Sequence, residues 1–313
     1  MEAAMQAATL VPVATGVRLN VSQTGTGEPL LLIMGTSGSL GFWEPLVPRF
    51  AERHRVIAFD SRGLGQSERG EERITTASLA ADAAALLDAL EIERAHVLGW
   101  SLGSAVAQEL ALAHPERVGG LVLYGTWGRL DGFMRAMLTA LRHPWETGDM
   151  EAALTALGLA FSPELLNNPD FESMLEAFLP LFPQTETQIR TTAEQWQADQ
   201  EHDSLDRLAG IGAPTLVIAG EQDLLTPPWQ CQAVAERIPG ARYELLTGPG
   251  SSHALMMERA EEFITVVLAF VRDARAAEFR VVLARPACVV SPPCPGLTRA
   301  GAHGDAARRG RPR

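Results

Sequence analysis

Ser101 is the residue of this sequence whose surroundings point most clearly to nucleophilic chemistry. It is the middle residue of the segment Gly-Trp-Ser-Leu-Gly at 99–103, which follows a short apolar run and opens a stretch of helical period. A serine on such a strand-to-helix turn is held at a strained angle above the sheet, and glycines are needed because neighbouring backbone crowds the turn. The pattern alone would arise by chance in roughly one chain in ten, so its context carries the prediction of a nucleophile rather than a tight turn with a small residue.

His253 is the best placed of the seven histidines to act as a base for a serine hydroxyl, which is a poor nucleophile at neutral pH. It follows the last predicted strand, in a glycine-rich loop at 247–253 that precedes the final predicted helix. The base in turn needs a carboxylate that fixes its tautomer, and Asp223 comes directly after another predicted strand. Glu221 is the local rival, but it is too close to the strand end to reach across comfortably. The sequence therefore predicts a triad of Ser101, Asp223 and His253.

Two backbone N–H groups are expected to stabilise the oxyanion that forms when such a serine attacks a carbonyl. One belongs to Leu102, the residue after the predicted nucleophile. The other should come from a loop after an early strand, and the segment Met-Gly-Thr-Ser-Gly at 34–38 fits, with Thr36 as the donor. A phosphate-binding loop is the alternative for this glycine-rich segment, but it has neither the lysine nor the spacing of that motif.

The elements that must position these residues alternate along the chain between short apolar runs and segments of helical period. Strands are predicted at Leu30–Met34, Val56–Phe59, Ala95–Leu98, Leu121–Tyr124, Thr215–Ala219 and Ala241–Leu246. Helices are predicted at Thr76–Leu90, Leu102–His114, Gln230–Ile238 and Arg259–Ala276. This rhythm predicts the α/β class, with a mostly parallel, doubly wound sheet whose carboxyl edge gathers the triad. An antiparallel hairpin is expected before Leu30, with Gly25 and Gly27 at its turn.

The alternation of strands and helices predicts four parts of the chain. Residues 1–125 and 208–278 form the two halves of the core, and residues 126–207 form a helical cap over the carboxyl edge of the sheet. Within the cap, Ser162-Pro163 is expected to begin a helix that runs toward Leu179. Residues 279–313 are rich in Pro, Arg, Gly and Ala, and we interpret them as a disordered tail.

Aromatic residues near the predicted site and in the cap could line an apolar pocket. Trp100 is the best candidate because it precedes the nucleophile, and Trp127, Phe133 and Trp145 are further candidates. The alternative for each cap aromatic is that it packs in the core of the cap, which is the commoner fate of such residues. Taken together they favour a medium or bulky hydrophobic substrate, and no arginine stands out as an anchor for a substrate carboxylate.

The composition excludes several classes of protein. The chain has 313 residues, 46% of them hydrophobic, and a net charge of −12, which disfavours nucleic acid and anionic membranes as partners. The basic segment 279–313 could be a nucleic-acid arm, but it has almost no aromatic residues. The three cysteines have no metal-ligand spacing, and no secretion signal or membrane span is visible, so a cytoplasmic enzyme without metal or cofactor is expected.

From Thr15 to about Val271 the chain resembles the α/β-hydrolases, most closely enzymes of the 3-oxoadipate enol-lactonase and cofactor-free haloperoxidase type. The resemblance rests on five segments, which are GTSGSLGFW (35–43), DSRGLGQS (60–67), GWSLGS (99–104), GEQDLLTP (220–227) and GPGSSHALMME (248–258). The order Ser, Asp, His is also that of this family. The sequence departs from the usual pattern at the start of the oxyanion loop, at Ser104, in the longer histidine loop and in the C-terminal tail.

Three functions follow from these observations. The first is a serine hydrolase that cleaves a carboxylic ester or lactone of a medium or bulky apolar substrate through an acyl-enzyme. The second is a non-hydrolytic lyase of polyketide-type secondary metabolism, in which His253 removes a proton and an acyloxy group such as acetate is eliminated. The third is a ligand-binding module with an inactive site, which the intact triad disfavours.

Overall fold

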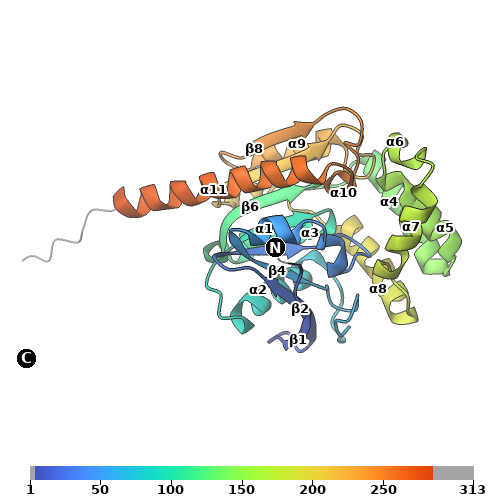
Figure 1. The fold of residues 1–313 in the computed structure, drawn as a ribbon, viewed down its shortest axis with the longest axis horizontal. Helices are drawn as coiled ribbons and strands as arrows, with labels where there is room; N and C mark the ends of the chain where they lie inside the picture. The colour runs from blue at the N-terminus through green and yellow to red at the C-terminus, as the bar shows by residue number, and fades with distance from the viewer. Residues whose placement is uncertain (1–3, 285–313) are drawn as a thin grey trace, which may run out of the picture.

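The computed structural model describes residues 4–284, and an eight-stranded sheet forms its centre (Figure 1). The strands are β1 (Thr9–Pro12), β2 (Arg18–Thr24), β3 (Glu28–Ile33), β4 (His54–Phe59), β5 (Ala95–Trp100), β6 (Val118–Tyr124), β7 (Thr215–Gly220) and β8 (Arg242–Leu246). Their order is β1-β2-β4-β3-β5-β6-β7-β8, and all pairs from β4 to β8 are parallel. The predicted α/β class with a mostly parallel sheet is confirmed.

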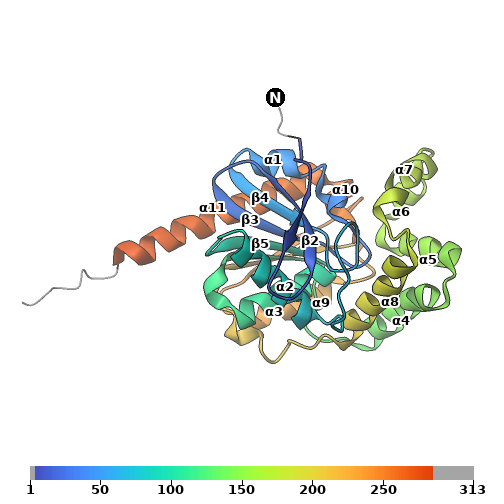
Figure 2. The same cartoon turned by 90° about the horizontal axis from the view of Figure 1, so that it is seen from below.

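Helices cover both faces of the sheet, because the central strands are buried on both sides. One face is covered by α1 (Val47–Ala51), α10 (Leu255–Glu258) and α11 (Ala260–Ala284), and the other by α2 (Thr76–Ala89), α3 (Leu102–Ala113) and α9 (Pro228–Arg237) (Figure 2). Short 3-10 turns occur at η1 (Leu40–Trp43), η2 (Pro115–Arg117), η3 (Leu157–Ala160), η4 (Leu179–Leu181) and η5 (Leu208–Gly210).

The N-terminal hairpin differs from the prediction. Strands β1 and β2 do pair antiparallel, but their turn is at 13–17, whereas Gly25 and Gly27 connect β2 to β3, which are not neighbours. Strand β4 lies between them and pairs antiparallel with β2. Both glycines have positive φ, and a Cβ added at Gly25 would lie 2.4 Å from the carbonyl oxygen of His54. Glycine is therefore required here because the connection crosses close to the backbone before β4, and not because the chain folds back on itself.

Five helices, α4 (Gly132–Thr147), α5 (Met150–Ala156), α6 (Pro163–Leu166), α7 (Phe171–Phe178) and α8 (Glu186–Glu201), lie together beside one end of the sheet (Figures 1 and 2). We propose that residues 126–207 form a part of the chain distinct from the core, and we call this part the cap. The single helix predicted from Ser162 toward Leu179 is wrong. Ser162 caps α6 as expected, but Pro169 has no N–H and disfavours a helical conformation in the residue before it, so α6 ends and α7 starts anew.

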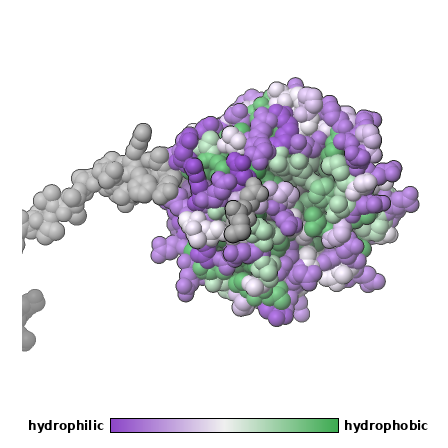
Figure 3. Space-filling model, viewed as in Figure 1, coloured by the Kyte–Doolittle hydropathy of each residue, from purple (hydrophilic) through white to green (hydrophobic). Residues whose placement is uncertain are grey.

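Helix α11 continues to Ala284, beyond the predicted end at Ala276 and past the predicted start of the tail at 279. No glycine or proline interrupts the sequence before Pro286, which explains the longer helix. The rest of the predicted tail lies outside the described residues. Within residues 4–284, no helix combines the length and apolar character that crossing a bilayer requires. On the face of the molecule seen in Figure 3, hydrophilic residues predominate and hydrophobic residues form patches between them.

Candidate active site

Ser101 lies on the turn between β5 and α3 with φ 54° and ψ −123°, a conformation that L-residues rarely adopt. Two close approaches of backbone explain the glycines on either side. A Cβ at Gly99 would lie 2.2 Å from the carbonyl oxygen of Gly103, and a Cβ at Gly103 would lie 2.1 Å from that of Ile33. The Ser101 N–H donates to the Tyr124 carbonyl at 2.9 Å, which fixes the turn to β6. Backbone contacts with β3 and β6 therefore hold the turn in its strained conformation.

The loop at 34–38, which we call the oxyanion loop, runs directly beside this turn. A Cβ at Gly35 would be 3.1 Å from the Cβ of Ser101, so only glycine lets the two backbones come this close without a shift. Thr36 follows Gly35, and Ser37 has φ 66°. Leu102 is the first residue of α3, so its N–H has no acceptor within the helix. The two backbone donors predicted from the sequence therefore flank the predicted nucleophile.

His253 and Asp223 meet at the carboxyl edge of the sheet, as predicted. The distance between His253 Nδ1 and Asp223 Oδ2 is 2.8 Å, and both side chains are buried. Asp223 also accepts bonds from the N–H groups of Leu225 (2.9 Å) and Thr226 (2.8 Å) and from the Thr226 hydroxyl (2.8 Å). A carboxylate held by this many donors has a fixed orientation, and its contact with Nδ1 leaves Nε2 as the free nitrogen of the imidazole.

The backbone of His253 is held by two aromatic side chains. Its carbonyl oxygen accepts bonds from Trp100 Nε1 at 3.0 Å and from the Tyr124 hydroxyl at 2.5 Å. The Trp100 and Tyr124 rings are stacked, with centroids 6.1 Å apart and an interplanar angle of 11°. Burial raises the pKa of Tyr124 well above its ordinary value, so the hydroxyl keeps its proton and remains a donor.

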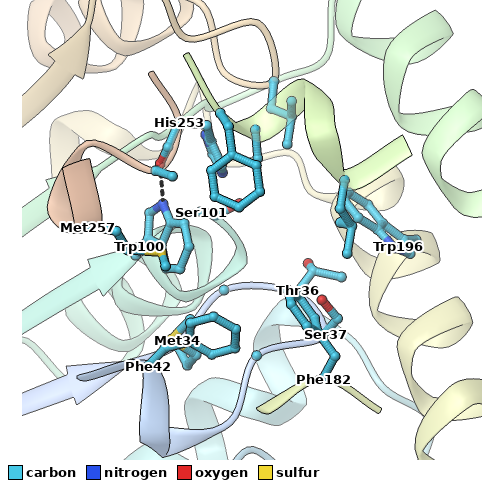
Figure 4. Close-up of a pocket in the computed structure, with 17 residues that line it drawn as sticks. Met34, Thr36, Ser37, Phe42, Trp100, Ser101, Phe182, Trp196, His253 and Met257 are labelled. Atoms are coloured by element: carbon cyan, nitrogen blue, oxygen red, sulfur yellow. Dashed lines mark hydrogen bonds between the residues drawn. The ribbon is translucent and has the colours of Figure 1, made fainter. Parts of the chain in front are cut away.

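A cavity of about 60 Å³ opens between the core and the cap, and Ser101, Thr36 and His253 all line it (Figure 4). Most of its wall is apolar. The large side chains of the wall are those of Met34, Phe42, Trp100, Phe161, Phe182, Trp196 and Met257. Among the described residues that line it, His253 is the sole titratable side chain, and none is an arginine or a lysine. The cavity therefore suits an uncharged, apolar group beside Ser101.

Three of the four predicted pocket residues do not line this cavity. Trp127 and Trp145 are buried in the core of the cap, where they pack with residues of α4 and α8. Phe133 is 42% exposed and packs edge-on against Trp229 at the molecular surface. Only Trp100 is placed as predicted. The apolar side chains of a cap helix cannot be sorted into core and cavity from periodicity alone, because both environments bury the same residue types.

Two polar residues of α8 were not predicted, although they contact the oxyanion loop. The Thr36 hydroxyl donates to Asp199 Oδ2 at 2.6 Å, and the Ser37 N–H donates to Gln195 Oε1 at 2.9 Å. Both α8 side chains are buried, and burial raises the pKa of Asp199 from 3.8 to about 7. In the sequence, Asp199 lies among many polar residues of a helix that looks solvated, so no pattern distinguishes it. Within residues 4–284, no cluster of three or more His, Cys, Asp or Glu side chains could hold a metal ion.

The raised pKa of Asp199 predicts a pH-dependent stability that the variant Asp199→Asn should lack. The folded protein keeps a proton on Asp199 that the unfolded chain loses above pH 3.8, so this group favours folding at low pH. That contribution, up to about 4 kcal/mol, disappears as the pH rises to about 7. His202, the nearest histidine along the chain, is bonded to Thr76 and Gln108, and burial lowers its pKa to about 4.

Urea unfolding of both proteins at pH 5 and pH 8 measures this effect. We expect the wild type to lose more free energy of unfolding than Asp199→Asn between the two values. The control is Glu186→Gln, which removes an exposed carboxylate from the first turn of the same helix. Equal losses in wild type and Asp199→Asn would contradict the prediction.

A second contact between cap and core lies beside His253. Glu258 accepts bonds from the Ser252 hydroxyl at 2.5 Å, from the Ser162 N–H at 3.0 Å and from the Ser162 hydroxyl. The Ala254 N–H also donates to the carbonyl oxygen of Ala160 at 2.9 Å. Both neighbours of His253 are therefore linked to the segment before α6. Ala254 is bonded to it directly, and Ser252 is linked to it through Glu258.

The sheet order, the strand-to-helix turn at a serine and the Ser–Asp–His order define an α/β-hydrolase architecture. The family model described as the alpha/beta hydrolase fold matches residues 28–260, and the chain belongs to this family. The resemblance inferred from the sequence is thus confirmed, and the chain is a hydrolase.

Curated relatives include a protein of Azorhizobium caulinodans with the provisional name carbamate hydrolase RutD, 34% identical over 79% of this chain and 92% of its own length. The 2-hydroxymuconate semialdehyde hydrolase of Pseudomonas sp. strain CF600 is 30% identical over 85% of this chain and 94% of its own. Among solved structures, the enol-lactonase of Burkholderia xenovorans LB400 superposes with a TM-score of 0.76 and 27% identity, covering 84% of this chain and 100% of the other.

Proposed function

We propose that this protein is a serine hydrolase that cleaves a carboxylic ester or lactone through an acyl-enzyme. The observation that carries the proposal is that Ser101, on its strained turn, and His253, held by the buried Asp223, line one apolar cavity. The similarity to an enol-lactonase supports the choice of an ester or lactone bond. The roles of nucleophile, base and orienting carboxylate belong to Ser101, His253 and Asp223.

The mechanism follows from the positions of these groups. Ser101 Oγ attacks the substrate carbonyl carbon while its proton passes to Nε2 of His253, the nitrogen that Asp223 leaves free. The backbone N–H groups of Thr36 and Leu102 stabilise the charge that develops on the carbonyl oxygen. The tetrahedral intermediate expels the alcohol, which takes the proton from His253. A water molecule, deprotonated by His253, then hydrolyses the acyl-enzyme and releases the acid and the free serine.

The size of the cavity limits which acyl groups the protein can bind. Its volume of about 60 Å³ is far below the ~300–1,000 Å³ of pockets for drug-sized ligands, which favours a short acyl group beside Ser101. The sequence predicts a medium or bulky apolar substrate, and for its acyl part we propose a short, uncharged and apolar group.

A panel of p-nitrophenyl esters from acetate to decanoate tests both the activity and the acyl size. We expect kcat/KM to fall at least about tenfold from butyrate to decanoate, because longer chains exceed the small volume of the cavity. The variant Phe182→Ala should move the preference toward longer chains, since this ring lines the cavity and packs edge-on against Phe42 at 5.1 Å. A wild-type preference for decanoate would contradict the assignment of a short acyl group.

Hydrolysis in isotope-labelled water separates the proposed reaction from elimination. The acyl-enzyme route places one labelled oxygen in the acid. Formation of an alkene from an acyloxy substrate, with no label in the alkene, would instead favour the lyase. Labelling of Ser101 by a fluorophosphonate probe is expected for the hydrolase, and a folded protein that stays unlabelled would argue for an inactive binding module.

A further inference from the structure

Helix α8 of the cap contacts the oxyanion loop through two consecutive residues of that loop. Asp199 accepts the hydroxyl hydrogen of Thr36, and Gln195 accepts the backbone N–H of Ser37. The two α8 residues are four apart, so both side chains leave the same face of the helix. Trp196, between them in sequence, lines the cavity (Figure 4). The face of α8 that closes the cavity is thus also the face that holds the oxyanion loop.

The loop needs such support because its conformation is unfavourable. Ser37 has φ 66°, a left-handed conformation that costs a non-glycine residue roughly 1 kcal/mol or more. Its N–H would be free to turn without Gln195, and the Thr36 side chain would be free without Asp199. The Gln195 bond fixes the peptide between Thr36 and Ser37, and the Asp199 bond fixes the side chain of Thr36, whose N–H is the donor proposed for the oxyanion.

The supporting helix is itself fixed to the core. Gln188 Nε2 donates to the Gly65 carbonyl at 2.8 Å, and Arg69 Nε donates to Glu194 at 3.1 Å. Near the end of α8, Arg73 donates to Glu201 at 2.6 Å. Helix α8 is therefore a rigid base from which Asp199 and Gln195 can direct the loop.

The burial of Asp199 at this position is energetically unfavourable. It is completely buried, its second oxygen Oδ1 has no hydrogen-bond partner among the described residues, and neither does Nε2 of Gln195. A buried carboxyl group with one bond destabilises the fold relative to an apolar side chain of similar size. Packing alone does not explain why a carboxyl group is buried here, whereas a role at the neighbouring active site does.

We propose that Asp199 is a positioning residue, which orients the Thr36 N–H toward the substrate oxygen by holding the Thr36 hydroxyl. This inference rests on the proposed hydrolase function and extends it to the cap. Because the oriented N–H matters most when charge develops on the oxygen, the loss of Asp199 should lower kcat and leave KM nearly unchanged.

Kinetics of the variants Asp199→Ala, Thr36→Val and their combination test the proposal with a p-nitrophenyl ester. Each single variant should lose about tenfold in kcat, and the double variant should be no worse than Thr36→Val, because both changes remove the same bond. Thr36→Ser keeps the hydroxyl and should retain most activity. Asp199→Asn keeps an acceptor oxygen of the same shape and should also retain most of it. Glu186→Gln, which changes an exposed carboxylate in the first turn of α8, is the matched control and should equal the wild type.

The outcomes separate this inference from the proposed function. A double variant that loses about a hundredfold, or single variants that change KM and not kcat, would overturn the positioning role while the hydrolase assignment stands. A wild type that hydrolyses no ester of the panel would overturn both. Thermal unfolding followed by circular dichroism shows which variants are folded at the assay temperature. Thr36→Val and Asp199→Asn keep the test valid if Asp199→Ala is unfolded.

Discussion

Replacing Ser101 by alanine is expected to lower ester turnover at least about a thousandfold. The change removes the attacking oxygen, while the backbone turn is fixed by Gly99 and Gly103 and by the bond from the Ser101 N–H to the Tyr124 carbonyl. The fold should therefore persist, and stopped-flow or steady-state assays with p-nitrophenyl butyrate measure the loss directly.

The variant Ser101→Gly is a useful control for this prediction. It should be as inactive as the alanine variant and more stable than the wild type, since glycine adopts φ 54° without strain. Retained product formation in either variant would show that Ser101 is not the nucleophile and would favour a reaction in which His253 acts alone.

The change Asp223→Asn is expected to lower kcat by a factor on the order of a thousand or more. An asparagine fits the same space, but it can present an N–H to His253 Nδ1 and so favour the wrong tautomer of the imidazole. It also loses the negative charge that stabilises the imidazolium. The measurement is kcat across pH 6–9, together with circular dichroism to show that the fold is kept.

Glu221→Gln is the matched control, because Glu221 is the other carboxylate of the same loop. Glu221 is exposed and accepts a bond from the Gly248 N–H at 2.8 Å, away from His253. Its variant should keep kcat within about threefold of the wild type. A larger loss in Glu221→Gln than in Asp223→Asn would reverse the assignment of the carboxylate.

The fold and the triad could be predicted from the sequence because both depend on local features of the backbone. Buried parallel strands leave continuous apolar runs, and the parallel direction of β5, β7 and β8 carries the residues that follow them to one edge of the sheet. The glycines on either side of Ser101, Gly99 and Gly103, likewise report close backbone contacts that leave no room for a Cβ. Chain order and local composition were enough to bring Ser101, Asp223 and His253 together.

The cap and the pocket could not be predicted to the same extent because they depend on packing between distant segments. Trp127 and Trp145 were predicted to line the pocket, and only the packing of α4 against α8 shows that they lie in a hydrophobic cluster apart from it. Asp199 was not predicted because a polar residue on a polar helix is expected to be exposed. Only the structure shows that it contacts the oxyanion loop. The position of Gly25 was misread because glycine occurs both at turns and where chains cross.

Glu258 links the start of α6 to the segment that carries the histidine. It accepts two bonds from Ser162, where α6 begins, and one from Ser252, the residue before His253. A movement of α6 away from the core would therefore remove two of the donors of Glu258 and loosen the segment that carries the imidazole. Separation of α6 from the core and loss of alignment of the histidine would then be one event.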